Sequence, residues 1–355
     1  MTPQTFTFQD YQAQKYFANL DGLRFICIAM VLWHHGQPIA RGTYALADRG
    51  FLGVDFFFVL SGFLITTLLL READKNGSFS IRNFYQRRIL RIMPIYFFVV
   101  TVMALYFWQV KGMEVGRLLP YYYLFLSNFL IEHLPTLSIT WSLSVEEQFY
   151  LLFPITLFWL PRRFLPSALI IAIIVNIVFG AGWIPLDAPV FGPLTIALPN
   201  STYAPILMGS LLALVAHSPS GFAFLNRSLG SNWAAVAMLA LLILILRMAP
   251  QDVTGVPNFI IHSCMTFALA ALVLRTNTRL SRILQNPLIV RIGIISYGIY
   301  LYHMIAKDFM IRVFAKIGIE NDWLLLVAYS AASIVIADIS FRTLEAYFRR
   351  FRPSE

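Results

Sequence analysis

The stretch LDGLRFICIAMVLWHH, residues 20–35, places a guanidinium and two imidazoles near the ends of an otherwise apolar segment. Apolar runs of this kind recur along the 355-residue chain, in which 58% of the residues are hydrophobic and 13% are charged. A soluble domain carries about 25% charged residues, and roughly 20 apolar residues cross a bilayer as a helix. The sequence therefore predicts an all-α fold, a polytopic transmembrane helical bundle.

Eleven apolar segments are candidates for membrane spans. They cover residues 21–37, 51–70, 92–110, 118–131, 147–161, 164–182, 201–217, 232–249, 257–274, 291–311 and 322–341. Basic residues cluster in 71–91, 162–163, 275–291 and 342–352. Basic loops stay cytoplasmic, and all four clusters share that side only if one segment between 92 and 161 does not span. The expected exception is 118–131, as a re-entrant or interfacial piece, which leaves about ten spans with both termini cytoplasmic.

This pattern divides the chain into three expected parts. They are a cytoplasmic tail of residues 1–17, a membrane domain of residues 18–347 and a cytoplasmic tail of residues 348–355. The N-terminus shows no basic region followed by a small-residue cleavage site, so we expect the first apolar segment to be retained. The glycine- and proline-rich residues 180–200 are expected to form an extracytoplasmic loop.

The net charge of +9 does not indicate a nucleic-acid partner. The basic residues lie in the loops between apolar segments, as the positive-inside rule predicts. Cys27 and Cys264 both lie inside apolar runs, so we expect buried thiols rather than a disulfide or a metal site.

Arg24 and His35 share one face of the first predicted helix. They are eleven residues apart, a net rotation of about 20° and a rise of roughly 16 Å. Asp21 joins this face, whereas His34 lies about 100° away. One interpretation is an arginine that snorkels to the interface and a histidine at the opposite interface. The other is a charge and a base that face a polar cavity, which is the default for ionisable groups inside a membrane.

The segment GVDFFFVLSGFLIT, residues 53–66, carries Asp55 among phenylalanines. An aspartate in such a segment needs a partner, and His35 or His34 at the same expected depth could provide one. A carboxylate that orients an imidazole is a common general-base arrangement. Ser61 and Gly62 are expected to let two helices approach closely.

The segment FYQRRILRIMPIY, residues 84–96, places Arg87, Arg88 and Arg91 at the cytoplasmic start of a span. Two readings stay open. The arginines either anchor the topology or bind a polyanion such as a nucleotide phosphate.

The segment TWSLSVEEQFYLLFP, residues 140–154, begins an apolar helix with two carboxylates. One acidic residue in a first turn is explained by capping, but Glu146 and Glu147 together exceed that need. Ser142, Glu146 and Tyr150 recur every fourth residue and are expected to line one face.

A second polar face is expected in ISYGIYLYHMIAKD, residues 295–308. Ser296, Tyr300, His303 and Lys307 follow one another by steps of four, three and four. A polar face on a membrane helix is expected to look into the bundle.

Together these segments resemble the acyltransferase-3 family of integral membrane acyltransferases. Arg24 and His35 fit the family's pattern of a basic residue, ten residues and a histidine. The other segments fit further blocks in order, as far as FRTLEAYFRRF near the C-terminus. The resemblance implies transfer of an acyl group, usually acetyl, from cytoplasmic acyl-CoA to a hydroxyl of a cell-envelope carbohydrate or glycoconjugate. It implies a location in the bacterial cytoplasmic membrane, with the lipid bilayer, acyl-CoA and the acceptor as partners. Some relatives carry an additional hydrolase-like domain.

Roles for individual residues follow from combining the faces with this resemblance. His35 is the expected general base or transient acyl carrier, with Asp55 and Glu146 to orient it or to handle the proton. Arg24, Arg87, Arg88 and Arg91 are expected to hold the phosphates of CoA. The expected substrate-binding residues are Trp141, Ser142, Glu147, Tyr150, Ser296, Tyr300 and His303. The competing interpretation is a transporter or flippase for a glycan or an anionic substrate, although the sequence shows no inverted repeat.

Overall fold

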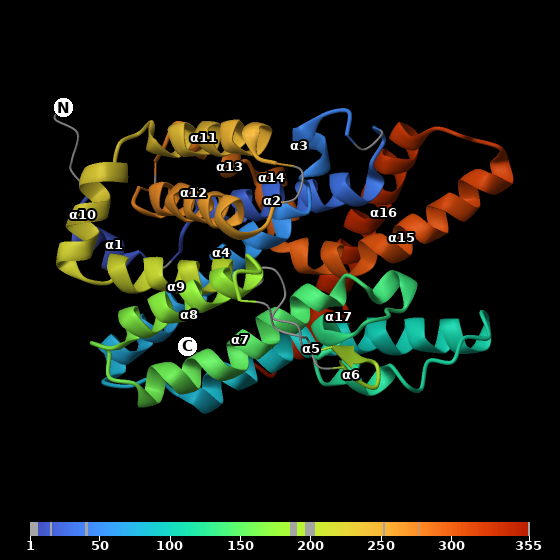
Figure 1. Ribbon diagram of the computed structural model, residues 1–355, viewed down its shortest axis with the longest axis horizontal. Coiled ribbons are helices and arrows are strands. Elements are labelled where there is room, and N and C mark those ends of the chain that lie inside the picture. The colour runs from blue at the N-terminus through green and yellow to red at the C-terminus, as the bar shows by residue number, and fades with distance from the viewer. Residues whose placement is uncertain are drawn as a thin grey trace.

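The structure, a computed structural model, is built almost entirely of helices (Figure 1). It describes residues 6–14, 16–39, 42–184, 190–195, 203–250, 253–275 and 277–353. Within these residues the only strands are β1 (Val190–Phe191) and β2 (Leu194–Thr195), which pair as an antiparallel hairpin. The predicted all-α class is confirmed. Residues 185–189 and 196–200 of the expected extracytoplasmic loop lie outside the described residues.

The longer helices form the bundle, and short helices connect them. The longer ones are α2 (Asn19–Gly36), α4 (Leu52–Asn76), α5 (Ile81–Gln109), α7 (Thr140–Trp159), α8 (Leu165–Gly180), α9 (Ala204–Ala216), α11 (Ala234–Met248), α12 (Gly255–Val273), α15 (Ser296–Ile317) and α16 (Asp322–Arg342). The short ones are α1 (Phe8–Ala13), α3 (Ala45–Asp48), α6 (Leu119–Tyr123), η1 (Ser127–Phe129), η2 (Pro135–Leu137), α10 (Pro219–Leu229), α13 (Ser281–Leu284), α14 (Pro287–Ile294) and α17 (Leu344–Arg349). Polar caps start some of them: Ser80 accepts from an amide of α5 and Asn321 from one of α16.

Length and apolar composition qualify four of the described helices as membrane spans. They are α4, α5, α12 and the continuous stretch Asp322–Arg349, and the number rises to six if each of two bent pairs counts as one span. The predicted count of about ten spans is therefore not confirmed, although the chain is an integral membrane protein by these helices. Segment 118–131 forms only α6 and η1, too short to cross a bilayer.

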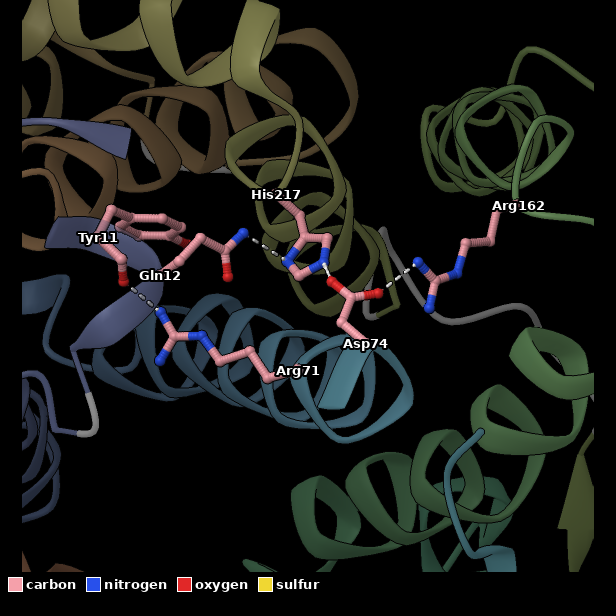
Figure 2. Close-up of polar contacts among 6 residues, drawn as sticks. All are labelled: Tyr11, Gln12, Arg71, Asp74, Arg162 and His217. Carbon is pink, nitrogen blue, oxygen red and sulfur yellow. Dashed lines mark hydrogen bonds and ion pairs between the residues drawn. The ribbon is translucent and has the colours of Figure 1, made fainter. Parts of the chain in front are cut away.

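The arginine-rich loops lie together on one side of the bundle. Arg71, near the end of α4, donates to the carbonyl oxygen of Tyr11 at 2.8 Å (Figure 2). Asn19, at the start of α2, donates to the carbonyls of Leu272 and Arg275 at the end of α12. Because the N-terminal residues touch both helix ends, the loops after α4 and α12 share a side.

Further ion pairs bring the other two basic clusters to the same side. Asp74, at the end of α4, lies 2.8 Å from Arg162 and 2.5 Å from His217 (Figure 2). Arg291 of α14 donates to Asp338 at 2.8 Å, next to the C-terminal cluster. These contacts agree with the expectation that all four basic clusters face one way.

Two glycines allow α4 and α9 to cross at backbone contact. A Cβ atom added at Gly62 would lie 1.9 Å from the carbonyl oxygen of Ile206, and one at Gly209 would lie 2.0 Å from that of Val59. Across the same contact Ser210 donates to the carbonyl oxygen of Gly62 at 3.3 Å. Small residues at a membrane helix crossing serve this purpose. The expected role of Gly62 in close packing is therefore confirmed.

We expect Gly62→Ala to destabilise the protein, because the new methyl group collides with backbone that cannot turn aside. Overpacking of this kind costs about 1–3 kcal/mol, which thermal unfolding followed by fluorescence size-exclusion chromatography in detergent would detect. Gly116→Ala is the matched control, since a Cβ there meets nothing within 4 Å. Equal melting temperatures for the two variants would contradict the close crossing.

The placement of the basic loops also predicts the topology. Reporters fused at Asn76 and Leu280 should report the cytoplasm, and one at Val190 should report the outside, because basic loops are retained inside. Alkaline phosphatase and green fluorescent protein fusions provide complementary readings. Opposite locations for Asn76 and Leu280 would refute the shared side.

Candidate active site

A cavity of about 300 Å³ lies among α2, α4, α5, α7 and the junction of α14 with α15. The two helices of that junction are bent by 73°, and Ile294 and Ser296 on either side of the bend line the cavity. The first amides of α15 have no side-chain cap. A helix N-terminus carries partial positive charge and stabilises an anion. The bend therefore places the positive end of α15 at the cavity.

The polar face predicted for α7 lines the cavity. Ser142, Glu146 and Tyr150 all border it, as their spacing by four residues requires. Ser61 of α4 donates to Glu146 at 2.9 Å, and Ser142 lies 2.7 Å from the hydroxyl of Tyr300 in α15. Ser61 was expected to allow close helix packing, but its hydroxyl instead donates a hydrogen bond to the carboxylate of Glu146. Three helices are thus joined by hydrogen bonds inside the cavity.

Four arginines line the cavity, and we call them the arginine cluster: Arg24, Arg71, Arg88 and Arg91. They come from three helices, α2, α4 and α5, on the side of the basic loops. The guanidinium of Arg88 lies over the ring of Tyr150, 5.0 Å from its centroid. A guanidinium held in this way keeps its donors directed outward for a phosphate or carboxylate.

The N-terminal segment forms one wall of the cavity. Arg71 donates to the carbonyl oxygens of Tyr11 and Gln14, and Tyr16 and Phe17 border the cavity next to it. Burial raises the pKa of Tyr16 to about 12, with a further contribution from its hydrogen bond to Asp21. Tyr16 therefore remains a neutral donor over the physiological pH range.

Asp21 and Arg24 form an ion pair at 2.8 Å on the face predicted for α2. Both side chains line the cavity. The arginine is about a quarter exposed (23%), so part of its guanidinium stays available to a ligand.

Arg87 lies apart from the arginine cluster. Its guanidinium forms an ion pair with Glu72 of α4 at 2.8 Å, and it does not line the cavity. Sequence spacing puts Arg87 and Arg91 on a common face, but the carboxylate at the end of α4 draws Arg87 to the neighbouring helix. The structure thus separates it from the other three predicted phosphate-binding arginines.

His35 lies at the opposite end of α2, in contact with α15. Its Nδ1 atom is 3.2 Å from Nε2 of His303, and the two ring centroids are 4.7 Å apart. His303 in turn lies beside Tyr300, whose ring borders the cavity, at a centroid distance of 5.6 Å. Lys307 donates to the carbonyl oxygen of His35 at 2.5 Å. The predicted polar face of α15 therefore runs from the cavity to His35.

The expected pairing of Asp55 with His35 or His34 is wrong, because its partner is on another helix. The Oδ2 atom of Asp55 lies 3.0 Å from Nε2 of His262, a buried residue of α12. Gly53 is the residue of α4 that meets α2, since an added Cβ would lie 2.5 Å from the carbonyl oxygen of Cys27. Residue 55 lies about 200° further round the helix, so its carboxylate faces α12.

Two further predicted residues lie outside the cavity. Trp141 packs edge-on against Phe58, with centroids 6.0 Å apart, and Glu147 is half-buried on α7. Neither borders the cavity, unlike Ser142 and Tyr150 on the same helix.

Three residues that were not among the predicted site residues make polar contacts inside the bundle. Arg71 and Tyr16 line the cavity, and His262 holds Asp55. Arg71 follows an apolar run within the basic cluster 71–91, so its position in the sequence indicates only topology. The sequence does indicate His262, because a histidine inside a membrane segment is a functional candidate by default.

This arrangement suits a ligand with a polyanionic end and a long, mostly apolar arm. The arginine cluster offers charge-assisted donors for phosphates, and the cavity continues past Glu146 and Ser142 to Tyr300. The fold and the cavity together describe a membrane protein whose polar side chains converge in a cavity between helices.

The comparison with protein families identifies this class. The acyltransferase-3 family model, described as an acyltransferase domain, matches residues 17–342. The chain belongs to this family, as the order of its segments indicated. No solved structure matches the chain.

Two relatives are similar over almost the whole of this chain. A peptidoglycan O-acetyltransferase of Listeria monocytogenes, OatA, is 28% identical, covering 95% of this chain and 56% of the relative. An O-acetyltransferase of Staphylococcus aureus, also OatA, is 25% identical, covering 95% of this chain and 58% of the relative. The chain thus spans a little over half the length of these relatives.

Proposed function

We propose that this chain is a membrane O-acyltransferase that moves an acyl group, with acetyl as the simplest choice, from acyl-CoA to a hydroxyl of a cell-envelope carbohydrate or glycoconjugate. The observation that carries the proposal is the cavity that extends from the arginine cluster to Tyr300. Outside the cavity, Tyr300 contacts His303, and His303 contacts His35. The names of the two relatives, both O-acetyltransferases, support acetyl transfer.

The donor would bind with its phosphates at the arginine cluster. Arg24, Arg88 and Arg91 would hold the phosphates from the cytoplasmic side, and Arg71 adds a fourth cation next to them. The pantetheine arm would pass Glu146 and Ser142 and bring the thioester toward Tyr300. Partly desolvated guanidinium groups bind phosphate more strongly than exposed ones, because water competes less.

His35 would act on the acceptor hydroxyl at the end of α2 that lies opposite to Arg24. As a general base it takes the hydroxyl proton while the oxygen attacks the thioester carbonyl carbon. The C–O bond of the ester forms, the C–S bond breaks, and the proton passes from His35 to the departing CoA thiolate. As an acyl carrier, a ring nitrogen would attack the thioester carbonyl carbon, forming an N–C bond as the C–S bond breaks and CoA leaves as the thiolate. The acceptor oxygen would then form the ester C–O bond as the N–C bond breaks, and the hydroxyl proton would pass to the thiolate. Retention of radiolabel from [¹⁴C]acetyl-CoA on the protein without acceptor would identify the second route.

Glu146 would assist by stabilising positive charge or handling a proton inside the cavity. It borders the cavity and accepts a hydrogen bond from the hydroxyl of Ser61. Asp55 is not included in this set, since it forms its contact with His262 on another helix.

The competing function is a flippase for a glycan or anionic substrate. CoA thioesters distinguish the two, because only a protein that binds the donor is stabilised by it through mass action. Thermal unfolding with and without acetyl-CoA therefore provides a direct comparison. Failure of acetyl-CoA to raise the melting temperature would favour the flippase.

We expect the double variant Arg88→Ala, Arg91→Ala to raise the KM for acetyl-CoA strongly and to leave the KM for the acceptor nearly unchanged. Each lost charge-assisted contact should cost about 1.5–3 kcal/mol. Arg87→Ala is the matched comparison, since it removes the same charge from the same helix outside the cavity. If Arg87→Ala raised this KM as much as the double variant, the placement of CoA at the arginine cluster would be wrong.

We expect His35→Ala to abolish transfer and His34→Ala to cost much less. The loss of a general base lowers the rate by about 10²–10⁴-fold, and by more if a covalent intermediate is lost. Residue 34 points about 100° away from the Arg24 face, and its ring packs against Phe51. Turnover at matched expression, with size-exclusion profiles to verify folding, measures both. Near-normal turnover of His35→Ala would remove this histidine from the mechanism.

A further inference from the structure

Two imidazoles from different helices meet at the end of α2, and we call them the histidine pair: His35 and His303. His303 is fully buried and His35 is half-buried. The planes of the two rings are inclined by 61°. The shortest polar contact joins Nδ1 of His35 to Nε2 of His303 at 3.2 Å. The protonation of each ring nitrogen can be deduced from what surrounds it.

His303 carries its proton on Nδ1. That atom lies 2.6 Å from the carbonyl oxygen of Tyr300, one turn earlier in α15. A carbonyl oxygen only accepts hydrogen bonds, so Nδ1 must donate. In a neutral imidazole the other nitrogen is then an acceptor. The Nε2 atom of His303 therefore presents a lone pair to His35.

His35 also carries its proton on Nδ1. This atom faces two acceptors, Nε2 of His303 at 3.2 Å and the carbonyl oxygen of Val31 at 3.0 Å. The Val31 carbonyl accepts the backbone bond that an α-helix makes at that position, and its second lone pair is an acceptor within the same helix. His303 supplies the acceptor from outside the helix. The Nε2 atom of His35 is consequently the unprotonated nitrogen.

We propose that His303 is a positioning residue, which fixes the proton of His35 on Nδ1 and thereby presents Nε2 as the reacting nitrogen. The inference rests on the proposed acyltransferase function of His35. The bond also fixes the orientation of the ring, because a 180° flip would turn a carbon atom toward both acceptors. Lys307 holds the backbone of the same residue through the carbonyl oxygen of His35, so α15 fixes both the ring and the end of α2.

The first test compares turnover of purified wild-type protein, His303→Leu and His303→Gln with acetyl-CoA and isolated cell-envelope glycan. His303→Leu removes the acceptor and should lower kcat by about 10²-fold, with the KM for acetyl-CoA changed less than about twofold. The glutamine carbonyl oxygen reaches about as far as Nε2 and should restore most of the lost activity. Tyr302→Phe is the matched control, since it removes a buried hydrogen bond of α15 to Ser340 without touching His35.

Two outcomes of this test would overturn the inference. Normal turnover of His303→Leu would show that the acceptor is dispensable. Equal loss in the leucine and glutamine variants, both with wild-type size-exclusion profiles, would show that some other property of the ring matters. In either case an active wild type and an inactive His35→Ala variant leave the proposed function standing.

The second test reads the tautomer directly and does not require turnover. Solid-state NMR of protein labelled with ¹⁵N at its six histidines, with the His35 signals assigned by their loss in His35→Ala, reports which nitrogen carries the proton. We expect a protonated Nδ1 and an unprotonated Nε2 in the wild type, and a mixture of tautomers in His303→Leu. A proton on Nε2 of His35 in the wild type would overturn the inference, whether or not acetyl transfer is observed.

Discussion

An ionisable side chain cannot be left against lipid, and this constraint explains how the bundle is assembled. Two carboxylates that lie among the helices meet partners from other elements. Glu146 meets Ser61, and Asp55 meets His262. Such contacts cost less than an unsatisfied group in hydrocarbon. The helices are therefore rotated so that their polar faces converge, and the cavity occupies the place where they meet.

Helix α15 connects the two ends of this polar interior. Ser296 and Tyr300 border the cavity, whereas His303 and Lys307 contact the end of α2. One rigid helix thus carries side chains that border the cavity with the arginine cluster and side chains that contact the end of α2. The bend between α14 and α15 also places a helix N-terminus near the arginine cluster, where it adds to the positive potential.

Features set by a single helix could be predicted from the sequence. The common face of Arg24 and His35 and that of Ser142, Glu146 and Tyr150 follow from 3.6 residues per turn, and the side chains of the second set border one cavity as expected.

Features set by the rotation of one helix against another could not be predicted in the same way. The partner of Asp55 depends on which side of α4 faces α12, and Gly53 decides that by its contact with α2. Arg87 and Arg91 are one helical turn apart on the same face, but Arg87 forms an ion pair with Glu72 at the end of α4. The number of spans depends on helix lengths that hydropathy alone does not determine.

The contact between α4 and α9 has a consequence for the order in which the protein is made. Ser210 bonds to Gly62 across 148 residues of chain. At the roughly 5–20 residues per second of synthesis, α9 emerges about 7–30 s after α4. During that interval the glycine surface of α4 faces lipid or the insertion machinery rather than its partner. This close helix crossing therefore forms late, after the helices of the N-terminal part of the chain have been made.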